Sequence, residues 1–110
     1  LLADQNQVEQ VLINLILNGM EAMKETANPV LTIEGKTGRE YNQVIISDNG
    51  KGIDESSLSK IFIPFFSTKD DGTGIGLSLC RQIIQKHQGK LTVESTLNQG
   101  SRFTLWFPVV

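Results

Sequence analysis

The chain is poor in cysteine, proline and long apolar runs, and each scarcity excludes a class of protein. Its 110 residues include one cysteine, three prolines and 6% aromatic residues. One cysteine cannot form an internal disulfide, so the sequence does not indicate a disulfide-stapled secreted domain and suits a reducing compartment. No signal peptide and no apolar run of membrane-spanning length occur in it. We therefore expect a cytoplasmic location without direct membrane contact.

Positive charge is also scarce. Lysine and arginine total 10 against 12 acidic residues, for a net charge of −2. Because affinity for nucleic acid depends on a basic face that makes many phosphate contacts, we expect no nucleic-acid partner. The length fits one domain spanning residues 1–110. Its first residues read as an element cut part-way, so we expect a fragment of a longer chain.

Glycine, in contrast, is concentrated in one stretch, Gly72-Thr73-Gly74-Ile75-Gly76-Leu77, which opens an apolar helix. Glycines at alternate positions leave the backbone N–H groups accessible, and the helix directs its unpaired N–H groups and positive dipole end at the same point. The stretch therefore predicts a phosphate site. Its spacing is neither that of a P-loop nor that of the dinucleotide fingerprint. A flexible loop with a glycine-assisted turn is the alternative.

Two asparagines interrupt an apolar helix near the start of the chain. A capping-box pattern at residues 4–7 predicts where this helix begins, and residues 11–17 are apolar nearly all round, so we expect it to be mostly buried. Asn14 and Asn18 are four residues apart and share a face. A buried amide without a partner costs about 1–3 kcal/mol. The two amides either bond neighbouring backbone groups or face a polar ligand or hydrated metal, and the residues alone leave both open.

A second polar cluster follows a predicted antiparallel hairpin with strands at residues 30–36 and 43–47. The cluster is Asp48-Asn49-Gly50-Lys51-Gly52. No alternating strand follows it, which weakens the hairpin-turn interpretation of Asn-Gly. A calcium loop is rejected because Ser47 and Lys51 would stand where carboxylate ligands belong. What remains is a carboxylate that can accept a hydrogen bond from an amino group, beside glycines that let a ligand approach the backbone.

The remaining pattern predicts helices packed on one face of a mixed sheet, an α+β fold. Asp54 can cap a short helix through Ile61. An aromatic segment at 62–66 should pack on or bind something, and the polar loop at 67–72 that follows has the composition of a mobile lid. A helix from Ile75 should end at Gly89, followed by strands at 90–95 and 102–107.

Taken in order, these features resemble the catalytic ATP-binding domain of bacterial sensor histidine kinases, a member of the gyrase, heat-shock chaperone, histidine kinase and mismatch-repair ATPase superfamily. The family's asparagine box, first glycine box, phenylalanine box, second glycine box and last glycine motif are similar to Asn14–Asn18, Asp48–Gly52, Phe62–Phe66, Gly72–Leu77 and Gly100–Thr104. The resemblance covers nearly the whole chain. It implies a two-layer α/β sandwich of the Bergerat type, with a mixed, mostly antiparallel sheet covered on one face by helices and a mobile ATP lid.

The resemblance also implies ATP or ADP and Mg²⁺ as cofactors. Asp48 would accept the adenine amino group, and Asn18 would ligate Mg²⁺. Asn14, assisting near the phosphates, and Lys69, approaching the terminal phosphate, are the expected catalytic residues. The other expected cofactor-binding residues are Gly50, Gly52, Ile53, Phe65, Thr68, Gly72, Thr73, Gly74, Ile75, Gly76, Leu77 and Thr104, the last through a water beside the adenine.

Asn14 bears on the expected reaction. ATPases of the superfamily carry a glutamate there that activates water, and an amide cannot act as a general base. The resemblance therefore implies a protein-histidine kinase of a two-component system, which transfers the γ-phosphoryl group to a histidine on a separate dimerisation domain. Its other partner would be the receiver domain of a response regulator. The parent protein would be a homodimer and this fragment a monomer. The fragment would come from a cytoplasmic protein or from the cytoplasmic part of a membrane-anchored sensor.

Two alternatives remain at this point. Many such kinases carry a basic residue at the position where this chain has Glu21. This departure from the family pattern would suit a regulatory domain that senses ATP without transferring phosphate. A protein-serine kinase of the anti-sigma-factor type is the other. The Glu-Ala-Met sequence after Asn18 and that of the lid are similar to the subgroup of nitrogen-regulation kinases.

Overall fold

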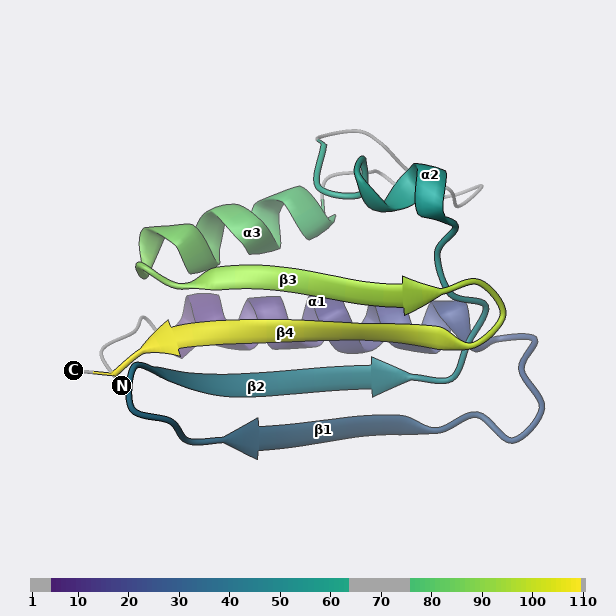
Figure 1. Cartoon of the computed structure of the whole chain (residues 1–110), viewed down its shortest axis with the longest axis horizontal. Coiled ribbons are helices and arrows are strands. Elements are labelled where there is room, and N and C mark those ends of the chain that lie inside the picture. Colours follow the sequence, from purple (N-terminus) through teal and green to yellow (C-terminus); the bar gives the residue numbers. More distant parts are fainter. Residues whose placement is uncertain (1–4, 64–75, 110) are drawn as a thin grey trace.

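The computed structural model describes residues 5–63 and 76–109. They form three helices and four strands (Figure 1). In chain order these are α1 (Gln5–Ala22), β1 (Leu31–Lys36), β2 (Tyr41–Asp48), α2 (Glu55–Leu58), α3 (Gly76–Lys86), β3 (Lys90–Thr96) and β4 (Gly100–Pro108). Every predicted helix and strand is present, with ends displaced by a few residues. The expected cap at Asp4 lies outside the described residues.

The four strands form one sheet in the order β1-β2-β4-β3. All of its pairings are antiparallel, so the expectation of a mixed sheet is wrong for the described part of the chain. The physical reason is that β1–β2 and β3–β4 are each hairpins, and the two hairpins meet along β2 and β4, which also run in opposite directions. In this register Ile46 lies opposite Phe103, and Asp48 lies opposite Ser101.

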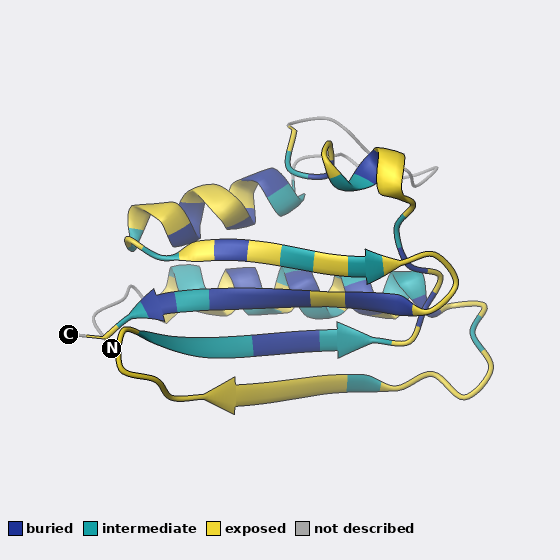
Figure 2. Ribbon diagram, viewed as in Figure 1, coloured by how far each residue is buried: buried dark blue, intermediate teal, exposed yellow. Residues whose placement is uncertain are grey.

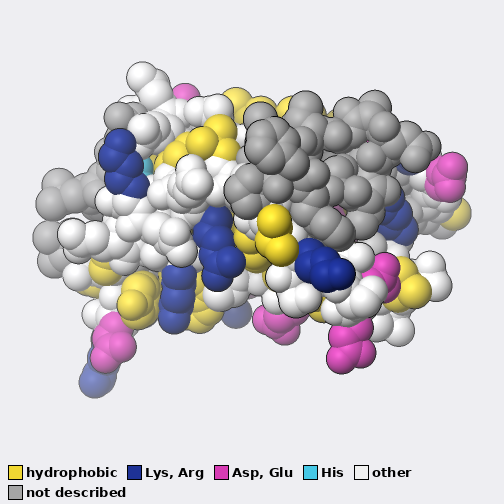
Figure 3. All heavy atoms as spheres, turned by 90° about the horizontal axis from the view of Figure 1, so that it is seen from above, with side chains coloured by type: hydrophobic (Ala, Val, Ile, Leu, Met, Phe, Trp, Pro, Cys, Tyr) yellow, Lys and Arg dark blue, Asp and Glu magenta, His cyan; other side chains and the backbone are white. Residues whose placement is uncertain are grey.

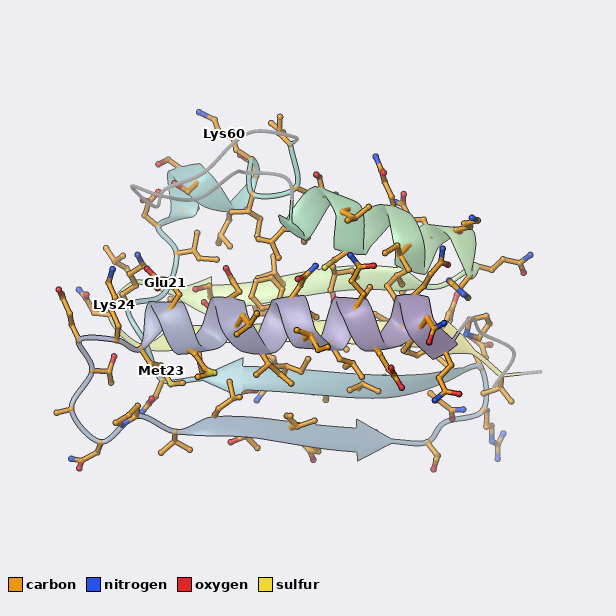
Figure 4. The ribbon with its side chains drawn as sticks, turned by 180° about the vertical axis from the view of Figure 1, so that it is seen from behind. Glu21, Met23, Lys24 and Lys60 are labelled. Atoms are coloured by element: carbon orange, nitrogen blue, oxygen red, sulfur yellow. The ribbon has the colours of Figure 1, made fainter. Side chains whose placement is uncertain are left out.

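The helices pack on one face of this sheet. Figures 1 and 4 show α1 running along β2 and β4, with α3 beside it against β3. The α+β two-layer architecture is therefore confirmed. Burial is greatest along β4, the dark strand of Figure 2, because this strand has a partner on each side and helices above it. The buried core consists of Val11, Leu15, Ile46, Ile61, Cys80, Ile83, Ile84, Leu91, Phe103, Leu105 and Phe107.

Helix α1 is buried on one side only. Val11 and Leu15 are at most 1% exposed, whereas Ile13 and Leu17 are 55% and 56% exposed. The expectation of a mostly buried helix is therefore wrong. An apolar run of this kind shows that a helix has apolar side chains all round, but it does not show whether a second layer covers its outer side.

A short turn of helix follows the Asp48–Gly52 loop. Asp54 is the N-cap of α2, and its carboxylate accepts a hydrogen bond of 2.8 Å from the Ser57 amide. The predicted cap is thus confirmed. The helix ends at Leu58 rather than continuing to Ile61, which lies in the turns that follow.

Candidate functional site

The carboxylate of Asp48 lies at the end of β2, on the face of the sheet that the helices cover. Side chains alternate along a strand, and Ile46, two residues earlier, belongs to the core. Helix α1 passes close to it. A methyl group added to Gly19 would lie 3.6 Å from Oδ2 of Asp48 and 2.9 Å from the Leu31 side chain. Gly19 directly follows Asn18, so the helix that carries the two asparagines passes beside the carboxylate.

Backbone amides hold the Asp48 carboxylate in place. Its Oδ1 accepts a hydrogen bond of 2.9 Å from the Gly50 amide, and the amide of Ser101 also donates to it. Burial raises the pKa of Asp48, while these two hydrogen bonds act in the opposite direction. A carboxylate that is partly desolvated yet fixed by amides is a directed acceptor, suited to bind one donor group of a ligand.

The glycines after Asp48 are required by the protein's own backbone. A methyl group added to Gly50 would lie 2.4 Å from the Ala22 carbonyl oxygen, and one added to Gly52 would lie 2.2 Å from that of Thr96. Gly52 also has φ = +70°, which disfavours other residues. Their expected role was to let a ligand approach the backbone. In the structure they allow the loop to pack against the end of α1 and against the β3–β4 hairpin.

Asn14 and Asn18 are both half-buried on α1. The Nδ2 group of Asn14 contacts the Cys80 Sγ of α3 at 3.7 Å, a long and weak donor–acceptor contact that joins the two helices. Cys80 itself is fully buried in the core, and burial raises the pKa of its thiol. Asn14 therefore has a packing partner as well as a place beside Asn18.

Thr104 does not lie beside Asp48. It alternates with the core residues Phe103 and Leu105, and its partners on the neighbouring strands are Ile45 and Thr92. Its side chain is therefore on the face that the described helices leave uncovered, so the expected contact near the adenine does not fit the register.

Ser101, rather than Thr104, is the residue of this motif that lies beside Asp48. It lies opposite Asp48, on the same face of the sheet as Phe103, and is 7% exposed. Sequence reasoning missed it. The alternation of side chains along β4 could have indicated it. Ser101 is two residues from the core residue Phe103 and so shares its face of the sheet, whereas Thr104 directly follows Phe103 and points to the other face.

The second glycine box is only partly described. Gly76 and Leu77 begin α3, and a methyl group added to Gly76 would meet no described atom within 4 Å. Ile53 lies between the two glycine boxes in sequence, packs against the core, and donates its amide proton to Ser95 Oγ. The predicted residues Phe65, Thr68, Lys69, Gly72, Thr73, Gly74 and Ile75 lie outside the described residues.

Charged groups near the end of α1 neutralise one another. Glu21 forms an ion pair of 3.0 Å with Lys24, as their positions in Figure 4 suggest. Figure 3 shows basic and acidic side chains interspersed with uncharged surface over the described part of the upper face. Among residues 5–63 and 76–109, no group of three or more His, Cys, Asp or Glu residues could hold a metal ion.

Comparison with known proteins supplies the family. Residues 3–110 match the family described as histidine kinase-, DNA gyrase B- and HSP90-like ATPases. The chain belongs to this family. It is 40% identical to the sensor histidine kinase ZraS of Salmonella typhi, over 98% of this chain and 23% of that protein. It is also 40% identical to sporulation kinase C of Bacillus subtilis, over 96% of this chain and 24% of that protein.

Solved structures agree with this assignment. The catalytic domain of the histidine kinase ThkA superposes with a TM-score of 0.84 at 39% identity, covering 96% of this chain and 69% of that one. The predicted resemblance to the catalytic ATP-binding domain of histidine kinases is thus confirmed. The subgroup of nitrogen-regulation kinases stays a prediction. The chain spans about a quarter of the length of the curated relatives named above.

No helix in the described ranges is long and apolar enough to cross a membrane.

Proposed function

We propose that residues 1–110 form a single domain that binds Mg²⁺-ATP and transfers the γ-phosphoryl group to a histidine side chain of a separate dimerisation domain. The observation that carries this proposal is the Asp48 carboxylate, half-buried and held by two backbone amides beside α1. An acceptor fixed in this way matches the exocyclic amino group of adenine. The family assignment supports ATP as the nucleotide.

Around Asp48 we assign the remaining contacts with the base to Ser101 and the backbone of the Gly50–Ile53 loop. Ser101 replaces Thr104 in this assignment because it lies opposite Asp48 in the sheet. The hydroxyl group can donate or accept a hydrogen bond, directly or through a water. The start of α3, at Gly76 and Leu77, presents N–H groups that have no partner within the helix, together with a positive dipole end, to the phosphates.

The described residues fit a magnesium ion held by few protein ligands. Mg²⁺ usually keeps several waters and binds through one or two protein oxygens together with substrate phosphates. The side-chain oxygen of Asn18 supplies one such ligand, on the residue next to Gly19, which packs beside Asp48. When bound, the ion neutralises charge that develops on the transferring phosphoryl group.

Asn14 can help to align the reacting groups, but its side chain does not ionise. Its amide cannot take a proton from water, so the site lacks a general base at this place on α1. Phosphoryl transfer needs mainly alignment and charge stabilisation, which amide groups, backbone N–H groups and a metal ion supply. We therefore assign the nucleophile to another domain. Lys69, Phe65, Thr68 and the glycines of 72–74 keep their expected roles in phosphate binding and lid closure as part of the proposal.

The test combines binding with transfer in trans. Calorimetric titration with ATP in the presence of Mg²⁺ should show saturable binding. A separately produced dimerisation domain carrying the acceptor histidine should then become labelled from γ-labelled ATP, with a label that is lost in acid. Binding without any transfer would favour the nucleotide-sensing alternative suggested by Glu21, and an acid-stable label would favour a protein-serine kinase. Absence of saturable ATP binding would refute the proposal.

A further inference from the structure

The hydroxyl group of Ser95 takes part in three hydrogen bonds, one with the loop after Asp48 and two within the β3–β4 hairpin. The Ile53 amide donates to Ser95 Oγ over 2.8 Å. Ser95 Oγ lies 2.9 Å from the Gly100 carbonyl oxygen and 2.8 Å from Ser101 Oγ. Ser95 thus touches the serine that lies opposite Asp48, although its own place in the chain is outside every predicted motif.

The direction of each proton follows from what each partner can give. A carbonyl oxygen has no proton, so the 2.9 Å contact with Gly100 requires Ser95 to donate. A hydroxyl has only one proton, so Ser95 can only accept from its other partners. The Ile53 amide supplies one of these protons, and Ser101 must supply the other. Ser95 Oγ then has its full complement of one donated and two accepted hydrogen bonds.

The consequence falls on Ser101. Because its single proton is directed at Ser95, only its lone pairs remain for anything that lies beside Asp48. Asp48 itself, when ionised, is an acceptor without a proton. The two polar side chains that face each other across β2 and β4 therefore both accept, and neither donates.

We propose that Ser95 is a positioning residue that sets the selectivity of the site for the purine base. Because Ser101 donates its proton in a hydrogen bond to Ser95, the side chains of Asp48 and Ser101 present only acceptor atoms to the base. This arrangement suits a purine with an amino group at its 6-position. The carbonyl oxygen of a 6-oxopurine meets oxygen lone pairs and finds no side-chain proton there. Its N1–H can still be accepted, so the discrimination falls on the 6-position. The inference rests on the proposed binding of adenine at Asp48.

The experiment compares ATP with inosine triphosphate, which has a carbonyl in place of the 6-amino group and a proton on N1 where adenine has a lone pair. Affinities of both nucleotides are measured by calorimetry with Mg²⁺ for the full chain and for Ser95→Ala. Removing the Ser95 hydroxyl frees the Ser101 proton to turn toward the base. The ATP-to-inosine-triphosphate affinity ratio should fall about fivefold, the effect of one neutral hydrogen bond. Most of the change should be a gain for inosine triphosphate.

Matched variants separate this role from a merely structural one. Ser95→Thr keeps the hydroxyl and should keep the ratio of the unmodified chain. Once Ser101→Ala has removed the proton, adding Ser95→Ala should leave the ratio unchanged. If Ser95→Ala does not fold, Ser95→Cys, which has a weak donor and acceptor in a side chain of similar shape, should shift the ratio in the same direction.

The outcomes distinguish the two proposals. Equal losses of affinity for both nucleotides in Ser95→Ala, with the ratio unchanged, would overturn the role of Ser95 and leave ATP binding intact. If the unmodified chain binds neither nucleotide, the proposed function fails first and this inference fails with it.

Discussion

The amide of Lys51 donates a hydrogen bond of 3.0 Å to the carbonyl of Ala22, the last residue of α1. This bond ties the loop after Asp48 to the helix that carries Asn14 and Asn18. The neighbouring Gly50 fits only because it has no side chain, since an added methyl group would lie 2.4 Å from the Ala22 oxygen. The relative position of the predicted base-binding and metal-binding residues is therefore set by a backbone contact.

Gly50→Ala should destabilise the chain even without nucleotide. Overpacking against backbone that cannot turn away costs about 1–3 kcal/mol. We expect a lower free energy of unfolding in urea for the nucleotide-free protein, and weaker ATP binding as a consequence.

Gly76→Ala is the matched control for this prediction. Its added methyl group meets no described atom within 4 Å, and alanine is the better helix former. Its stability should be unchanged or slightly higher. If Gly50→Ala is as stable as Gly76→Ala, the contact with the Ala22 carbonyl does not explain why position 50 is a glycine. The close approach of a ligand would then be the better explanation.

Asn18→Ala should weaken the binding of Mg²⁺-ATP about tenfold or more, as expected when one of few protein ligands to a metal is lost. Binding of ADP in the presence of EDTA should fall much less, because no metal takes part in it. Calorimetric titrations under the two conditions provide the measurement. Leu17→Ala, on the outer side of α1 where the side chain is 56% exposed, should change neither. Equal losses with and without metal would refute the role of Asn18 as a ligand.

Much of the fold was predictable because local patterns determine it. The spacing of Val11, Leu15 and Gly19 predicts the buried face of α1, and alternation predicts the core side chains of β4. Asp48 and Asn18 were found as site candidates because each is a polar residue in a context that does not otherwise need one.

What could not be predicted depends on register and on layers. Thr104 and Ser101 belong to the same short motif, and only the pairing of β4 with β2 decides which of them lies opposite Asp48. The network around Ser95 joins residues up to 42 positions apart, beyond the reach of any motif. Nor does the apolar outer side of α1 indicate from sequence whether another layer covers it.

Asp48→Asn should separate binding from folding. Asparagine keeps the shape and an oxygen for the Gly50 amide, but it turns an amino group toward the amino group of adenine, so ATP affinity should fall at least about tenfold. The fold should not suffer. Because burial raises the pKa of Asp48 in the folded state, its ionised form is the one that folding disfavours.

The pH dependence of stability checks this second expectation. The penalty for ionised Asp48 is absent below the pKa of the unfolded chain and grows as the pH rises through the folded pKa. The melting temperature of Asp48→Asn relative to the unmodified chain should therefore increase between about pH 3 and pH 7. A constant difference over this range would contradict the direction of the pKa shift, and unchanged ATP affinity would remove Asp48 from the base-binding site.

Asp54 should show the opposite pH dependence. Hydrogen bonds from the Ser56 hydroxyl, at 2.6 Å, and from the Ser57 amide lower its pKa, so the ionised carboxylate stabilises the start of α2. This contribution is fully present above the unfolded pKa, near 4, and is lost as the pH falls through the lower folded pKa. Asp54→Ala should therefore lower the melting temperature at pH 7, and the difference should shrink as the pH falls below about 4. Asp54→Asn keeps a capping oxygen that does not titrate, so it should destabilise less than alanine at pH 7 and show no such pH dependence of its own. If asparagine destabilises as much as alanine at pH 7, the contribution of Asp54 comes from its charge rather than from capping.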